Sequence, residues 1–265
     1  MSETMSDGLI LLEITNSIAC LTLNRPESKN AMNMEMLADL RLRLNEVLAN
    51  DTIHVLIIIG SYFGFSAGPD LKELLSDIQE RPGEPNCLDS ANDVLKIVRS
   101  FPIPVIAALS GLTMGGGLEL AMCADIVIAG ESAKIYDAHV NYGVFPGAGG
   151  AAVLPRLIPL NMAMYLLLTG RGLSAAEMKA CGLVSEVHPD MELQDAAMKL
   201  AEVIAHKSPL TLRRIKEVAR ASADKTRDDA ILHEQSMLRL HMGTEDFREG
   251  LQAFSEKRKP VFKGR

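Results

Sequence analysis

Tryptophan is absent from this chain, and aromatic residues together make up only 4% of it. A protein with so few flat rings has little from which to build a platform that stacks bases or sugars. The net charge of −7 also leaves no broad excess of basic residues, which a surface for nucleic acid requires. Both shortages argue against a nucleic-acid partner.

The sequence also gives no reason to expect disulfides or a targeting signal. The four cysteines lie far apart without any CxxC spacing, so we expect free, reduced thiols. The N-terminal MSETMSDG has neither the basic start nor the apolar stretch of a secretion signal, and no apolar run is long enough to span a membrane. These features predict a cytoplasmic protein with no membrane partner. The cysteines are Cys20, Cys87, Cys123 and Cys181.

What the chain does have is enough apolar sequence for a folded core, with 48% hydrophobic residues in 265. Short β-branched runs at 9–15 and 17–23 predict two antiparallel strands that meet at a tight turn. The apolar run HVLIII at 54–59 is typical of a strand buried on both faces of a mostly parallel sheet. The alternation of strands and helices predicts the α/β class. Further strands are expected at 105–109 and 126–129, and helices at 34–48, 94–98 and 118–123.

Two stretches indicate how the chain is divided. Residues 76–93, SDIQERPGEPNCLDSAND, are polar and contain two prolines, so we expect a loop over a site. Beyond residue 190 the apolar spacing is almost wholly helical, with helices expected at 193–206, 209–221, 228–240 and 245–255. We therefore place a core at 1–200 and a helical region at 201–265, which serves either for subunit contacts or as a covering layer.

The chemistry is concentrated in residues 103–125, IPVIAALSGLTMGGGLELAMCAD, where a buried strand runs into three glycines and a helix. Glycines at a helix start let a ligand approach the backbone and direct free N–H groups at it, which favours a developing oxyanion. A plain tight turn would also need glycine. Two further elements favour the oxyanion interpretation: GFSAGPDLKELL at 64–75 also follows a buried strand, and the glycine-rich VNYGVFPGAGG at 140–150 follows His139.

With these motifs the chain resembles the enoyl-coenzyme A hydratase/isomerase (crotonase) superfamily. The likeness extends over the whole length, because six segments occur in the family's order. They are LTLNRPESKNAMN at 21–33, GFSAGPDLKELL at 64–75, IPVIAALSGLTMGGGLELAMCADIVIAGESAK at 103–134, GVFPGAGGAAVLPRLI at 143–158, LTGRGLSAAEMKACGLVSEV at 168–187 and EGLQAFSEKRKPVFKG at 249–264.

The resemblance implies a crotonase-like spiral of ββα turns with a C-terminal helical trimerisation region, assembled as a homotrimer or a dimer of trimers. It implies an acyl-CoA thioester as the partner, with coenzyme A as part of the substrate and no tightly bound cofactor. The adenine would lie near 29–32 and 67–70, and Lys263 would lie near a neighbouring subunit's ligand. The binding residues so implied are Lys29, Ala31, Met32, Ala67, Gly68, Pro69, Asp70, Leu71, Gly115 and Lys263.

One position departs from the family's pattern. The family forms its oxyanion hole from two backbone N–H groups. The first position is Gly116 in this chain, and the second, the residue after SAG, is Pro69. Proline has no N–H, and the loss of one such donor costs about 10²–10³ in rate. Three alternatives are open: Asp70 supplies an N–H instead, a water donates, or the carbonyl is held differently.

The acid and base positions show a second departure. Glu119 occupies the place of one of the two catalytic glutamates of the hydratases, although a carboxylate near a helix start is also favoured by the helix dipole. The other glutamate is replaced by His139, which can exchange protons near neutral pH, and Asp137 could orient it if the backbone there is extended. We expect no metal, because the remaining histidines, His54, His188, His206, His233 and His241, lack metal-ligand spacing.

The preferred hypothesis is an enoyl-CoA hydratase of fatty-acid type, with Glu119 as the main acid/base, His139 as a second group and Gly116 as oxyanion donor. An isomerase could work with Glu119 alone. A histidine at position 139 also resembles the β-diketone (retro-Claisen) hydrolases, although these keep an aspartate where this chain has Ala148. The alternative of another class is a non-catalytic coenzyme A-binding homologue.

Overall fold

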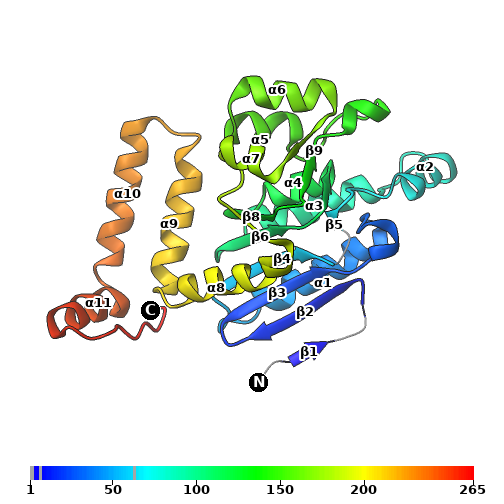
Figure 1. The fold of residues 1–265 in the computed structure, drawn as a ribbon. Helices are drawn as coiled ribbons and strands as arrows, with labels where there is room; N and C mark the ends of the chain where they lie inside the picture. The colour runs from blue at the N-terminus through cyan, green and yellow to red at the C-terminus, as the bar shows by residue number, and fades with distance from the viewer. Residues whose placement is uncertain (1–2, 6–7, 62–63) are drawn as a thin grey trace.

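The protein has a mixed α/β architecture with two sheets (Figure 1). The computed structural model describes residues 3–5, 8–61 and 64–265, so part of the N-terminal segment MSETMSDG lies outside the described residues. The predicted α/β class is confirmed. The strands are β1 Glu3–Met5, β2 Ile10–Thr15, β3 Ile18–Leu23, β4 Val55–Gly60, β5 Gly64–Ser66, β6 Val105–Leu109, β7 Leu112–Met114, β8 Ile126–Gly130, β9 Lys134–Tyr136, β10 Gly172–Ser174 and β11 Glu186–His188.

Eleven α-helices and three short 3-10 helices surround these strands in the described residues. The α-helices are α1 Met34–Leu48, α2 Leu71–Glu80, α3 Cys87–Arg99, α4 Gly116–Ala121, α5 Gly150–Leu157, α6 Leu160–Thr169, α7 Ala175–Ala180, α8 Leu193–Ala205, α9 Pro209–Ser222, α10 Arg227–His241 and α11 Glu245–Glu256. The 3-10 helices are η1 Pro26–Ser28, η2 His139–Tyr142 and η3 Asp190–Glu192.

The larger sheet has the strand order β1-β2-β3-β4-β6-β8-β11. Strands β2 and β3 are antiparallel and turn at Asn16, whose φ of 54° suits asparagine in a tight turn. From β3 onward the neighbours are parallel, and β4 is buried on both faces, as its continuous apolar run predicts. Leu56 and Ile58 pack into the main core, while Ile57 packs on the opposite face against α8.

The smaller sheet positions the candidate site. Its order is β10-β9-β7-β5, and the neighbouring strands β5, β7 and β9 are parallel. Parallel strands bring their carboxyl ends to one edge of the sheet, where ligands bind in open α/β structures. The segments that follow these strands are 67–70, 115–119 and 137–142, which contain the residues singled out from the sequence.

The prediction of a loop at 76–93 was wrong. Most of this stretch is helical, since α2 continues to Glu80 and α3 begins at Cys87. The polar residues that indicated a loop instead start the helix: the Asn86 side chain accepts from the Leu88 amide, and the Asp89 carboxylate accepts from the Asn86 amide in a capping box. Only 81–86 connects the two helices.

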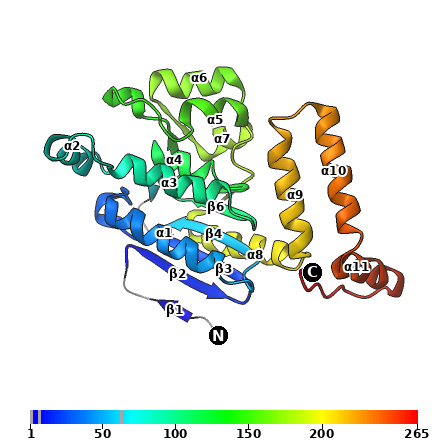
Figure 2. The same cartoon turned by 180° about the vertical axis from the view of Figure 1, so that it is seen from behind.

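The C-terminal helices α9 and α10 lie side by side and project from the body (Figures 1 and 2). Asp125 holds α9 to the body through ion pairs with Lys216 and Arg220 at 2.6 and 2.8 Å. Helix α8 covers the larger sheet, so the helical layer begins within the core. The division near residue 200 and the role of 201–265 in subunit contacts stay predictions.

We expect replacement of Asn30 to destabilise the fold. Asn30 is fully buried with φ of 53°, accepts from the Arg25 amide at 2.8 Å and donates to the Gly64 carbonyl at 2.8 Å. Asn30→Ala leaves both groups without their partner, which should lower the free energy of unfolding by about 2 kcal/mol beyond any backbone effect. Asn16→Ala is the matched control, because Asn16 has the same φ but is exposed. Equal losses of unfolding free energy for Asn30→Ala and Asn16→Ala in chemical denaturation would contradict this interpretation.

Candidate active site

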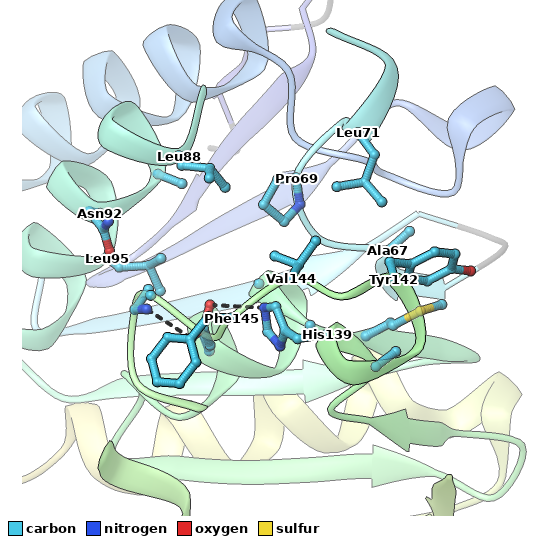
Figure 3. Close-up of a pocket in the computed structure, with 18 residues that line it drawn as sticks. Ala67, Pro69, Leu71, Leu88, Asn92, Leu95, His139, Tyr142, Val144 and Phe145 are labelled. Atoms are coloured by element: carbon cyan, nitrogen blue, oxygen red, sulfur yellow. Dashed lines mark hydrogen bonds and ion pairs between the residues drawn. The ribbon is translucent and has the colours of Figure 1, made fainter. Parts of the chain in front are cut away.

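The segments after β5, β7 and β9 enclose a cavity of about 140 Å³. In Figure 3, Pro69, Leu71 and Leu88 border one side of it, and His139 and Phe145 the other. Seven residues predicted for the site line this cavity: Ala67, Pro69, Leu71, Gly115, Gly116, Glu119 and His139. The structure thus brings together residues that are up to 72 positions apart in the sequence, from Ala67 to His139.

The amide of Gly116 is free to meet a ligand. Gly116 is the first residue of α4, where helix N–H groups lack an intrahelical partner, and its N–H donates to no other residue in the described part of the chain. A side chain at this position would meet the Pro69 Cδ atom at 2.7 Å. Glycine is therefore needed here because the proline ring lies against it.

The Pro69 side of the site offers no replacement backbone donor. The Asp70 amide donates to the Met32 carbonyl at 3.0 Å, and the Ala67 amide donates to the Lys29 carbonyl at 3.0 Å. The possibility that the Asp70 N–H moves into the oxyanion hole is therefore not realised in this structure. The Gly116 amide, at the start of α4, is the free backbone donor next to the Pro69 ring.

Glu119 points into the cavity from α4 and is only 4% exposed. Its Oε1 atom accepts from the Ala148 and Gly150 amides, both at 2.9 Å, so it caps the N-terminus of α5. Burying a carboxylate without such donors would be costly. The second oxygen, Oε2, lies 3.9 Å from His139 Nε2 and is free for chemistry.

His139 is oriented by Asp137. The imidazole Nδ1 and the Asp137 Oδ1 atom are 2.8 Å apart, and Asp137 is fully buried. This contact does not arise from an extended strand: β9 ends at Tyr136 and the chain turns into η2 at His139. The expectation that Asp137 could orient His139 holds, but through a turn in place of a strand.

The environment of His139 favours its charged form. Burial by itself lowers the pKa of the imidazole, but the hydrogen bond to Asp137 and the negative charges of Asp137 and Glu119 outweigh it and raise this pKa above the usual value. Protonated histidine is therefore more abundant near neutral pH than for an isolated imidazole.

The segments 29–32 and 67–70, expected at the adenine, lie against each other. The Met32 amide donates to the Gly68 carbonyl at 2.8 Å, and Arg25 binds both the Ala31 carbonyl and the Asp70 carboxylate. Burial would raise the pKa of Asp70, but the bonds from Arg25 and from the amides of α2 hold it below its usual value. Lys29, Ala31, Met32, Gly68 and Asp70 themselves do not line the cavity.

Lys263 lies elsewhere in the chain. Its amide donates to Asp246 at 2.7 Å, and its ammonium lies 3.6 Å from Glu245, next to α11. The structure therefore does not bring Lys263 to the cavity of its own chain. A role at a neighbouring subunit's ligand stays a prediction.

The sequence analysis missed one wall of the cavity and the two backbone amides that donate to Glu119. Leu88, Asn92 and Leu95 line the cavity from α3, in or next to the stretch taken for a loop. Their spacing at intervals of three and four residues was the signal that could have identified this helix. The Ala148 and Gly150 amides carry no side-chain signal, so only the backbone path of the glycine-rich loop shows what they bind.

No described helix has the length and apolarity that crossing a bilayer requires. In the same part of the chain, no group of three or more His, Cys, Asp or Glu side chains is arranged to hold a metal ion.

Comparison with known proteins gives consistent likenesses. Residues 13–265 match the model of the family described as enoyl-CoA hydratase/isomerase. A probable mitochondrial enoyl-CoA hydratase of Dictyostelium discoideum is 38% identical over 92% of this chain and 87% of its own, and the 2,3-dehydroadipyl-CoA hydratase of Escherichia coli (strain K12) is 35% identical over 94% and 96%. The crystal structure of an enoyl-CoA hydratase from Bacillus anthracis superposes with a TM-score of 0.91 at 33% identity, covering 97% of this chain and 99% of that one.

We expect Gly150→Ala to impair the site through Glu119. A methyl group at Gly150 would collide with the Asp137 Oδ2 atom and lie 2.8 Å from Pro146 Cβ, so the backbone that donates to Glu119 must shift. Loss of one donor to the buried carboxylate should lower the turnover rate by about tenfold or more. Gly243→Ala is the control, because Gly243 has only one atom, at 3.7 Å, near its added methyl. Equal rates for the two variants in a hydration assay would count against this role of Gly150.

Proposed function

Because the chain belongs to the enoyl-CoA hydratase/isomerase family and is a hydratase-like enzyme of the lyase class, we propose how its own residues add water to a 2-enoyl-CoA. Its fold is the crotonase fold, as the resemblance implied. The observation that carries the proposal is a free amide, a buried carboxylate and an oriented imidazole on one small cavity.

Gly116 stabilises the charge that forms on the substrate. Attack of water at C3 of a 2-enoyl thioester moves negative charge through C2 to the thioester oxygen, giving an enolate. The unpaired Gly116 N–H beside the cavity is the donor that can bind this oxygen. Pro69 and Leu71 form the apolar wall that excludes bulk water from it.

Glu119 and His139 move the protons. The Oε2 atom of Glu119 takes a proton from the attacking water as its oxygen bonds to C3, and His139 gives its Nε2 proton to C2. The product is a 3-hydroxyacyl-CoA, with Glu119 protonated and His139 neutral. The 3.9 Å between Oε2 and Nε2 lets one water relay the proton back and restore the starting state.

For the coenzyme A part of the substrate and for the oligomeric state, the proposal adopts what the family resemblance implies. Coenzyme A enters as part of the substrate, with its adenine against 29–32 and 67–70 and with no tightly bound cofactor. The exposed apolar residues Ile215, Ile231 and Leu238 on α9 and α10 support a homotrimer or a dimer of trimers. A cytoplasmic location and a role in fatty-acid metabolism complete the proposal.

The contact between Asp137 and His139 favours one second candidate, hydrolysis of a β-diketone, in which His139 activates water. That reaction needs His139 as a base and does not need Glu119. An isomerase, in contrast, would need Glu119 and release a product without added water. The non-catalytic alternative is disfavoured by the free Gly116 amide and the ordered Glu119 beside it.

We predict that Glu119→Gln abolishes hydration while substrate binding persists. The glutamine carbonyl can still accept from the Ala148 and Gly150 amides, so the loop should keep its place. The amide cannot take a proton from water, and the rate with crotonyl-CoA should fall by about 10²–10⁴. Glu131→Gln, at an exposed turn, is the matched control and should keep full activity.

Crotonyl-CoA affinity is measured in parallel by calorimetry. Unchanged hydration in Glu119→Gln would reject the assigned role. Turnover of a β-diketone that depends on His139 but not on Glu119 would favour the hydrolase.

A further inference from the structure

Two unusual residues lie against neighbouring glycines, Gly116 and Gly115. Pro69, which has no N–H to give, lies against Gly116 from the β5 side. His139 follows β9, on the other side of β7, and its Nε2 lies 3.6 Å from the position of a side chain on Gly115. The cavity that Gly115 and Gly116 line therefore has a missing donor at Pro69 and an imidazole at His139.

The Asp137 carboxylate is buried, but among the described residues only one of its oxygens has a hydrogen-bond partner. Its Oδ1 atom binds His139, and its Oδ2 atom is buried without a hydrogen-bond partner among the described residues. The Oδ2 atom faces Gly150 so closely that a side chain there would collide with it. An incompletely paired buried carboxylate is costly for stability. Stability alone therefore gives no reason for an aspartate here.

The charges around the imidazole are unbalanced. Asp137 faces Nδ1 at 2.8 Å, and Glu119 of α4 faces Nε2 at 3.9 Å. Tyr142 of η2 lines the same cavity with a phenol. Arg99 of α3 lies beyond the loop, where its guanidinium donates to the Ala148 carbonyl at 2.9 Å. The imidazole is thus the group that compensates two buried carboxylates, and its pKa is raised accordingly.

We propose that Asp137 is a positioning residue that maintains His139 as an imidazolium on the cavity that Gly116 lines, and that this cation offsets the oxyanion donor that Pro69 lacks. The inference rests on the proposed hydration. An enolate carries its charge on both the thioester oxygen and C2. Gly116 stabilises the oxygen end, and the Nε2–H of His139 stabilises the carbon end until its proton passes to C2.

Compensation by the His139 cation explains why Pro69 and His139, the two departures from the family's pattern, occur at one cavity. With a carboxylate at position 139, the enolate would face two negative groups and a single backbone donor. An imidazolium reverses the sign of one of these charges. The Asp137 contact is needed because burial alone would favour neutral imidazole.

The first test is the pH dependence of Asp137→Asn. His139 must be protonated to give its proton, so kcat/KM falls as the pH rises through the pKa of His139. Removing the Asp137 charge lowers this pKa, so the falling limb should move to lower pH, and kcat near neutral pH should drop by about 10²-fold with little change in KM.

The matched control for this test is Glu186→Gln. Glu186 also stands two residues before a histidine and lies 2.9 Å from it, but this exposed pair is on β11, away from the cavity. The control should leave the profile unchanged. If the falling limb of the kcat/KM profile stays at the same pH in Asp137→Asn, the proposal is overturned. A shift of the rising limb would also overturn it, because His139 would then act as a base.

The second test restores the missing amide and does not depend on how Asp137→Asn folds. Pro69→Ala supplies an N–H at position 69, and its effect on kcat is measured in the wild-type chain and in His139→Gln. If the cation offsets the missing donor, the gain from Pro69→Ala should be about tenfold larger in His139→Gln than in the wild-type chain. Equal gains in the two backgrounds would show that the sites act independently and would overturn the offset.

The two proposals fail in different ways. If the wild-type chain hydrates crotonyl-CoA and needs Glu119, but the pH limb and the double-mutant comparison show no coupling, only this inference is lost. If the wild-type chain does not hydrate crotonyl-CoA, the proposed function fails with it.

Discussion

The hydrogen bonds from the Ala148 and Gly150 amides to one oxygen of Glu119 are the constraint on which the site depends. They offset the cost of burying a carboxylate that is only 4% exposed. They also determine that Oε1 binds the backbone and that Oε2 is left toward His139. They also tie α4 to the start of α5, so Glu119 and the glycine-rich loop hold each other in place. The chemistry follows from this division of one side chain into two roles.

The small parallel sheet makes that constraint possible. Strands β5, β7 and β9 end at one edge, so the turns after them present Pro69, Gly116 and His139 in spatial order across the cavity. A donor, an acid/base and an imidazole are thereby held on rigid elements instead of on long loops. In the proposed mechanism, Pro69 leaves Gly116 as the oxyanion donor, since the Asp70 amide is already bound to Met32.

Much of this could be predicted from the sequence where the pattern is local. The continuous apolar run of β4 and the β-branched runs of β2 and β3 each specify a strand within a few residues. The three glycines ahead of Glu119 mark the start of α4. The start of α3 could not be found by composition, because Asn86 and Asp89 are typical of loops and of helix caps alike.

Contacts between distant segments were the harder part. The pairing of Asp70 with Met32, and of Glu119 with the loop before α5, involves backbone groups that leave no mark in the side-chain pattern. The contact between Asp137 and His139 was anticipated but assigned to strand geometry, whereas a 3-10 turn produces it. The expected position of Lys263 is of another kind, because it concerns a neighbouring subunit, and within its own chain Lys263 lies beside Glu245.

A crystal structure with bound butanoyl-CoA, a saturated thioester that cannot be hydrated, tests the central claim most directly. The thioester oxygen should lie about 3 Å from the Gly116 nitrogen, with C3 of the acyl chain beside Glu119 Oε2 and C2 beside His139 Nε2. A thioester oxygen turned away from Gly116, or an acyl chain outside the cavity that Glu119 and His139 line, would contradict the account.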